Sequence, residues 1–165
     1  MYFWATYIHI IFAMLWIGGM LFTAMILVPA SRRPLFDGKR GEFFQIVGTL
    51  FSKSSWMIFV IMIITGIAAL LGKGFSADQL MNIEFWRTAY GKILMSKLNI
   101  FVYVLLISAI HDFWLGPKAV RLMDEMPGDK KTERYKKITS WVGRINLVLG
   151  LIILYYASSL VRGLS

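Results

Sequence analysis

The sequence contains no cysteine. This absence excludes disulfide bonds, iron–sulfur clusters, thiolate metal ligands and cysteine nucleophiles together. Histidine is almost as scarce, because His9 and His111 are the only two in 165 residues. No serine or carboxylate is spaced with either histidine in the manner of a catalytic triad, so the sequence does not predict a hydrolase.

Charged residues are also few. They make up 16% of the chain, whereas soluble domains average about 25%, and 58% of the residues are hydrophobic. The deficit indicates an integral membrane protein rather than a soluble domain. The formal net charge of +9 comes from basic residues beside apolar runs. Such residues anchor helices and meet anionic lipid, so the predicted partner is the lipid bilayer and not nucleic acid.

Four long apolar runs are present, and each can cross a hydrocarbon core of about 30 Å as a helix. The first run lacks the basic start and the short apolar segment of a signal peptide, so we expect it to stay in the mature protein. The prediction is an all-α integral membrane protein, an antiparallel bundle of four transmembrane helices with short interfacial helices in its loops. It forms a single domain over residues 1–165, with spans at about 2–28, 54–72, 93–116 and 141–161.

Several local signals predict where helices begin and end. Residues 42–51 have the spacing of an amphipathic helix that either lies on the membrane surface or leads into the second span. A capping box of Ser76 and Gln79 should start a short helix. Gly116 and Pro117 should end the third span, because proline cannot continue the helical hydrogen bonds. Asp129 should cap a long final helix.

The distribution of basic residues predicts the orientation. Twelve lysines and arginines fall in the first and third loops, against five on the other side, so both termini are predicted on the non-cytoplasmic side of the inner membrane. The twelve are Arg32, Arg33, Lys39, Arg40, Lys53, Lys118, Arg121, Lys130, Lys131, Arg134, Lys136 and Lys137. The five are Lys73, Arg87, Lys92, Lys97 and Arg162.

His9 is the one ionisable side chain in the first apolar run. An imidazole inside a membrane helix needs a partner, and such residues usually mark a ligand site or an ion path. In the predicted topology, His9 lies near the outer end of its helix and His111 near the inner end of a parallel helix. The two should differ in depth by roughly 20 Å, which is too far for both to bind one haem iron. The sequence therefore predicts two polar sites at different depths.

The predicted outer site has the composition of a haem slot. It combines one histidine, small residues beside a bulky ring, and a cation for a propionate. A purely structural role for the lysine, reaching to the outer interface, is the alternative. The residues that we expect here are His9, Trp16, Gly18, Gly19 and Lys97, with Arg87 and Tyr90 as further candidates.

The predicted inner site gathers His111, Asp112 and Arg144. His111 is a second, weaker candidate for a haem ligand. The alternatives are that His111 hydrogen-bonds a neighbour or reaches the headgroups, and that Asp112 and Arg144 form a structural ion pair. An unpaired Arg144 inside the last span would be costly, which favours that pair.

Three segments together resemble a known family. They are the run HIIFAMLWIGG from His9 to Gly19, the start of a later helix at Lys97 and Leu98, and the run HDFWLGP from His111 to Pro117. This pattern resembles the copper-resistance D membrane-domain family and the related J-type protoporphyrinogen oxidases. The resemblance implies a helix-1 histidine associated with haem b, here His9, and a characteristic helix-3 lysine, here Lys97. Residues 21–29 depart from the oxidases, which carry a Tyr-Leu-Pro-Arg-like segment and a further histidine there.

Three functions follow as expectations. The first is a haem b-binding redox protein that transfers electrons, alone or as a subunit of a quinone-linked membrane complex. It would hold one haem b, or two if His111 also binds iron, and its partners would be a quinone, other membrane subunits or a second copy of the chain. The second is a J-type protoporphyrinogen oxidase acting on a porphyrin, and the third is copper transport or tolerance with copper as the ligand.

Overall fold

The computed structural model describes residues 2–162, without the side chains of residues 161 and 162. Met1 and residues 163–165 lie outside this part, as does the side chain of Arg162, which entered the charge count. All regular structure in the described part is helical. Four of the helices are long and apolar enough to cross a membrane, at Tyr2–Ala30, Arg40–Gly72, Ala89–Glu125 and Lys130–Leu160. The all-α membrane fold predicted from the sequence is confirmed.

Each span is a long helix, and two spans are assembled from several segments. The first span comprises α1 (Tyr2–Phe22), a π-helical turn (Thr23–Leu27) and α2 (Val28–Ala30), and the second is α3 (Arg40–Gly72). The third comprises α6 (Ala89–Ile110), a π-helical turn (His111–Leu115) and α7 (Gly116–Glu125), and the fourth is α8 (Lys130–Arg162). The loops hold a 3₁₀ turn (Pro34–Phe36), α4 (Ala77–Met81) and α5 (Ile83–Arg87).

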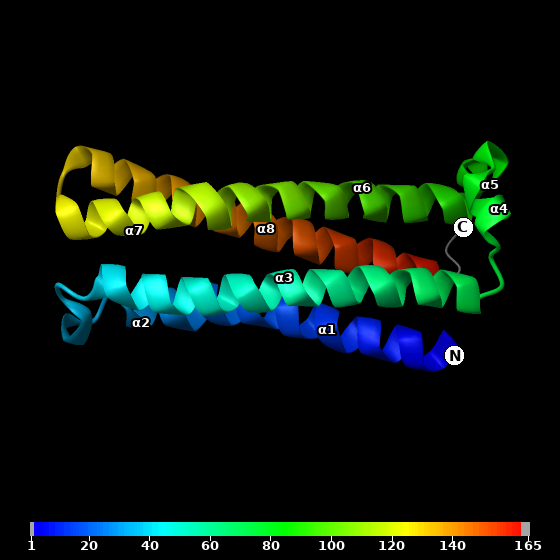
Figure 1. Ribbon diagram of the computed structural model, residues 1–165, viewed down its shortest axis with the longest axis horizontal. Coiled ribbons are helices and arrows are strands. Elements are labelled where there is room, and N and C mark those ends of the chain that lie inside the picture. The colour runs from blue at the N-terminus through cyan, green and yellow to red at the C-terminus, as the bar shows by residue number, and fades with distance from the viewer. Residues whose placement is uncertain (1, 163–165) are drawn as a thin grey trace.

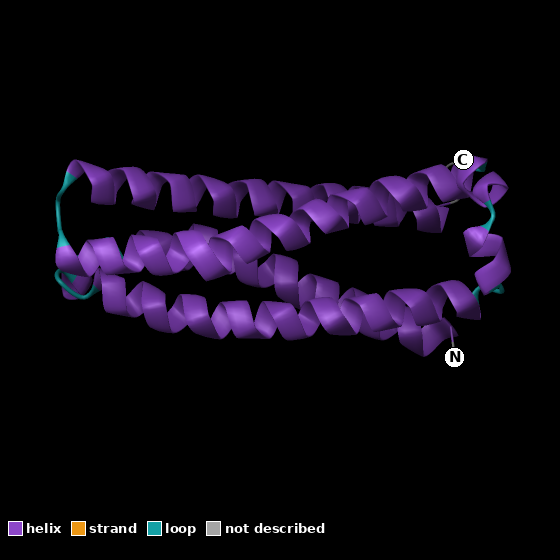
Figure 2. Cartoon of the chain, turned by 45° about the horizontal axis from the view of Figure 1, so that its top comes forward, coloured by secondary structure: helices purple, strands orange, loops and turns teal. Residues whose placement is uncertain are grey.

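The bundle consists of two helical hairpins. The most extensive contacts are those of α1 with α3 and of α6 with α8, and the hairpins meet through α3 against α7 and α1 against α8. Figure 1 shows that α1 and α6 run in the same direction, and that α1 begins at the end of the bundle where α8 finishes. In Figure 2 the short helices α4 and α5 cross between the hairpins at that same end. We call this the N-terminal end and the opposite one the loop end.

Two prolines within the spans follow π-helical turns. Pro29 lies one residue before the first span ends at Ala30, whereas the third span continues beyond Pro117. The prediction that Gly116 and Pro117 end the third span is wrong, because the helix continues as α7 to Glu125. Proline lacks an N–H and its ring crowds the carbonyl four residues earlier. The wider π turn over His111–Leu115 accommodates this, and the turn over Thr23–Leu27 does the same before Pro29.

The second span begins earlier than predicted. Residues 42–51 do not form a separate surface helix but are the first turns of α3, which corresponds to the other possibility raised by their spacing. Both predicted caps are confirmed. The hydroxyl of Ser76 accepts from the Gln79 amide, the Gln79 side chain accepts from the Ser76 amide, and Asp129 accepts from the Lys131 amide at 2.7 Å.

The packed core lies in the middle of the bundle. Its rings make edge-to-face contacts, with 5.2 Å between the ring centroids of Trp16 and Phe59 and 5.9 Å between those of Phe59 and Phe101. Many large apolar side chains, such as Met14, Ile64 and Leu106, are exposed on the outside of the bundle. An apolar exterior around a small core is the pattern of a protein solvated by lipid. The core cluster consists of Trp16, Ile17, Met20, Ile58, Phe59, Met62, Val104 and Ile153.

Candidate functional site

The histidine of the first span forms a hydrogen bond with the second span. The distance from His9 Nδ1 to Thr65 Oγ1 is 3.0 Å, and the Thr65 hydroxyl also lies 2.7 Å from the carbonyl oxygen of Ile61. A threonine hydroxyl has one hydrogen to donate. If it donates to Ile61, the Thr65 oxygen accepts from His9, so Nδ1 carries the proton and the lone pair lies on Nε2. A ligand could therefore bind His9 through Nε2.

Gly66 and Lys97 also lie near this imidazole. A Cβ atom added at Gly66 would be 3.4 Å from His9 Cε1, so glycine lets α3 pass closely beside the ring. Lys97 of α6 is half-buried and near enough for its charge to act on His9. Within the described residues, the Lys97 ammonium has no hydrogen bond and no ion pair. His9, Thr65, Gly66 and Lys97 are called the outer cluster below.

Two predicted members of the outer site are packing residues in this structure. Trp16 is 2% exposed in the core, where its ring lies 3.1 Å from a Cβ built on Gly150. A Cβ on Gly19 would fall 2.6 Å from the ring of Phe51, so that ring fills the space that the sequence suggested for a ligand. Gly66 instead makes room for the His9 ring itself against α3. A threonine followed by a glycine inside an apolar span is the sequence signal that could have indicated this contact.

The two further candidates for the outer site have other partners. Arg87 forms an exposed ion pair with Glu84 at 2.8 Å. Tyr90 packs against Phe75, with ring centroids 5.1 Å apart, and the Lys73 ammonium lies 5.0 Å from its ring centroid. Lys97 is thus the cation that the fold brings to His9.

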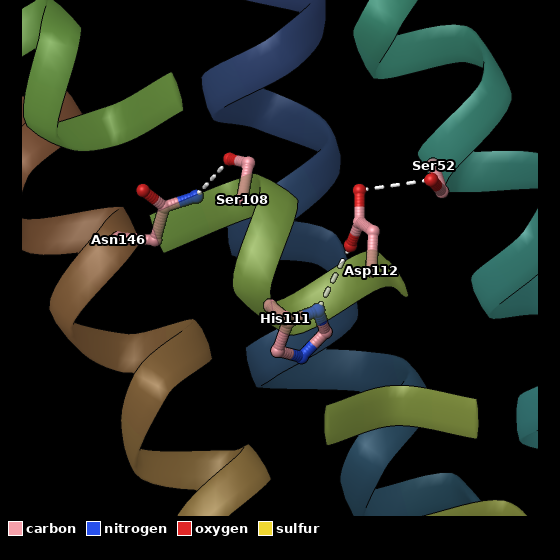
Figure 3. Close-up of polar contacts among 5 residues, drawn as sticks. All are labelled: Ser52, Ser108, His111, Asp112 and Asn146. Carbon is pink, nitrogen blue, oxygen red and sulfur yellow. Dashed lines mark hydrogen bonds and ion pairs between the residues drawn. The ribbon is translucent and has the colours of Figure 1, made fainter. Parts of the chain in front are cut away.

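A second polar chain crosses from the third span to the second, toward the loop end (Figure 3). His111 Nδ1 lies 2.9 Å from Asp112 Oδ1, and the Ser52 hydroxyl donates to Asp112 Oδ2 at 2.8 Å. Because a carboxylate accepts, the proton of a neutral His111 lies on Nδ1 and its lone pair on Nε2. Metal-bound histidines usually donate their other N–H to a carboxylate or carbonyl in this way. His111, Asp112 and Ser52 are called the inner cluster below.

Arg144 does not join the inner cluster. Its guanidinium carbon lies 5.4 Å from the Trp141 ring centroid, and the side chain is exposed. The predicted ion pair with Asp112 is therefore wrong for this structure, since Ser52 and His111 occupy the two carboxylate oxygens. The polar contribution of α8 at this level is Asn146, which donates to Ser108 at 2.9 Å (Figure 3).

The two clusters lie at different depths. Lys97 and His111 belong to one continuous helical span and are about 14 residues apart, or roughly 21 Å along the axis. The core rings Phe59 and Phe101 lie between these levels. His9, at the level of Lys97, and His111 therefore cannot bind the same iron. Within residues 2–162, no group of three or more His, Asp or Glu side chains could hold a metal ion.

Comparison with known proteins identifies the family. The chain is 28% identical over 151 residues to a protein of Aquifex aeolicus (strain VF5) described as an uncharacterized protein, covering 90% of this chain and 87% of that one. No solved structure matches. The family model for copper resistance protein D matches residues 46–160, a range that includes Lys97 and the inner cluster but not His9. By this match over most of its length, the chain belongs to the copper resistance protein D family.

Proposed function

We propose that this chain is a haem b-binding membrane redox protein, in which His9 would bind the haem iron and Lys97 would pair with a propionate. The observation that carries the proposal is that both side chains lie in the half of the bundle nearer its N-terminal end, one near the start of α1 and the other near the start of α6. His9 has Nδ1 engaged by Thr65 and Nε2 available, and the neighbouring Lys97 has no anionic partner in the described part. A cation in a membrane span is costly without a counter-charge, and a propionate supplies one.

The protein's own residues would prepare the site. Thr65 holds the imidazole in one tautomer and orientation, a role that outer hydrogen-bond partners play for metal-bound histidines. Gly66 allows the ring to lie close to α3. When bound, haem b supplies reversible one-electron transfer at its iron, with a potential tuned by axial ligand, burial and nearby charge. Electrons would pass to a quinone or to another membrane subunit.

The inner cluster is the second candidate ligand site. His111 is oriented by Asp112, which is itself held by Ser52, and its Nε2 has no hydrogen bond within the described residues. The offset of roughly 21 Å would make it a separate centre, because the two histidines could not bind one iron. If His111 binds iron, the protein carries two haems, one on each side of the core rings.

Copper handling is the second candidate function, because the family is described by copper resistance. Imidazole and thioether ligands suit copper, and the chain has ten methionines. Two histidines at different depths would then act as successive copper ligands across the membrane. Protoporphyrinogen oxidation, which the resemblance to the J-type enzymes implies, would require a porphyrin bound beside the outer cluster.

One preparation distinguishes these functions. The protein is purified in detergent and examined by a reduced-minus-oxidised spectrum, a pyridine haemochrome assay and metal analysis. The haem proposal predicts a Soret band and stoichiometric iron. Bound copper without haem would contradict that proposal and support copper handling instead. Oxidation of added protoporphyrinogen, followed by porphyrin fluorescence, would identify the oxidase.

We also propose that both termini face the non-cytoplasmic side of the inner membrane. The chain lacks cysteine, so single-cysteine variants at Tyr2 and Lys130 can be labelled without background. An impermeant maleimide added to spheroplasts should label the variant at Tyr2 and spare the one at Lys130. The reverse pattern would invert the orientation.

A further inference from the structure

An amphipathic groove lies at the loop end, between α7 and the first turns of α8. Its volume is about 430 Å³. Phe113 and Trp114 form one part of its wall and are 71% and 62% exposed. Lys118, Arg121 and Lys131 form the other part. The groove belongs to neither histidine cluster and has no role in the proposed redox function.

The depth of the groove matches the membrane boundary. The apolar run of the third span ends at Leu115, and Lys118 and Arg121 follow within two turns, which is the pattern of a helix leaving the hydrocarbon core. Trp114, one turn before Lys118, would then lie just inside the hydrocarbon, while Arg121 would lie among the headgroups. The apolar and cationic parts of the groove thus face the corresponding layers of the bilayer.

The groove also has unbalanced positive charge. Its acidic wall residue, Glu125, lies 2.9 Å from the Arg121 guanidinium and so neutralises that cation. Lys118 instead lies over aromatic rings, with its ammonium 4.8 Å from the Tyr135 ring centroid and 5.8 Å from that of Trp114. Neither Lys118 nor Lys131 forms an ion pair in the part of the chain described. Two ammonium groups are therefore available to one anion.

We propose that this groove binds an anionic phospholipid, with its phosphate between Lys118 and Lys131 and an acyl chain along Phe113 and Trp114. The charge of the groove complements an anionic headgroup, and its exposed rings complement the chain. A soluble phosphate would satisfy the lysines but would not cover the exposed faces of the two rings.

The test uses the full-length protein in mixed micelles containing phosphatidylglycerol and phosphatidylcholine, with retained lipid counted by native mass spectrometry. We expect selective retention of phosphatidylglycerol by the wild type. The double variant K118Q/K131Q should lose that retention by roughly thirtyfold, because each lysine near an anionic headgroup contributes about a factor of five. The double variant K118R/K131R keeps the charges and should retain the lipid.

The matched control is K39Q/K53Q, which removes two exposed lysines at the same end of the bundle but outside the groove. It should retain phosphatidylglycerol at the wild-type level. If the groove and control variants lost the same amount of retained phosphatidylglycerol, general charge attraction would explain the retention, and the proposed site would be overturned. Displacement of the lipid by an equal concentration of glycerol phosphate would also overturn the proposed lipid site. So would a protein dimer that retains no lipid.

Discussion

Replacement of Thr65 by valine tests the hydrogen bond on which the outer cluster depends. Valine has nearly the same shape as threonine but has no hydroxyl, so the His9 Nδ1–H loses its acceptor at 3.0 Å. The Ile61 carbonyl loses only a secondary bond, because it also accepts within α3. A donor left unpaired away from water costs about 1–3 kcal/mol. We therefore expect T65V to lower the free energy of unfolding in detergent by about that amount.

The same substitution should weaken binding of a ligand at His9 Nε2. Loss of the hydrogen-bond partner of a metal-bound histidine typically costs a factor of about 10–100 in affinity. The control is T65S, which keeps the hydroxyl and should remain close to the wild type in both measurements. Thermal unfolding followed by circular dichroism gives the stability, and retention of the Soret band during dilution gives the affinity. If T65V and T65S behaved alike in both assays, the assigned hydrogen bond would have no role.

Two further predictions concern packing and charge. Gly91→Ala should destabilise the protein by about 1–3 kcal/mol, because a Cβ there would collide with the Phe85 backbone, whereas Gly18→Ala, with open space at its Cβ, should be neutral or slightly stabilising. Thermal unfolding of both variants checks this, and equal stability would contradict it. Arg144→Ala and Asp112→Ala should have additive effects within about 0.5 kcal/mol, because no ion pair joins them. A larger coupling free energy in the double variant would show that the two side chains do form an ion pair.

The sequence predicted the helices better than their ends. Apolar runs identify spans because a helix is the one local structure that satisfies its own backbone in lipid. The caps at Ser76 and Asp129 were predictable because capping involves residues only two or three positions apart. The continuation past Pro117 was not, because a π turn depends on how the chain relaxes around the proline ring.

For the candidate sites, the sequence predicted the histidines but not the residues from other helices that contact them. His9 and His111 stand out as ionisable side chains in apolar runs, so both were found. Thr65, which bonds His9, lies 56 residues away in sequence, and Ser52, which bonds the Asp112 carboxylate beside His111, lies 60 residues from that aspartate. No local pattern determines which faces of two helices meet. The predicted pair of Asp112 and Arg144 was wrong for this reason, since charge alone does not fix helix rotation.

Binding of haem iron by His9 can be tested by the haem content of H9A compared with H111A. Both variants are purified in parallel, their helix content is checked by circular dichroism, and haem is measured per chain by the pyridine haemochrome assay. We expect H9A to lose the Soret band and H111A to keep a full haem at the outer cluster. Full haem content in a folded H9A protein would contradict this expectation.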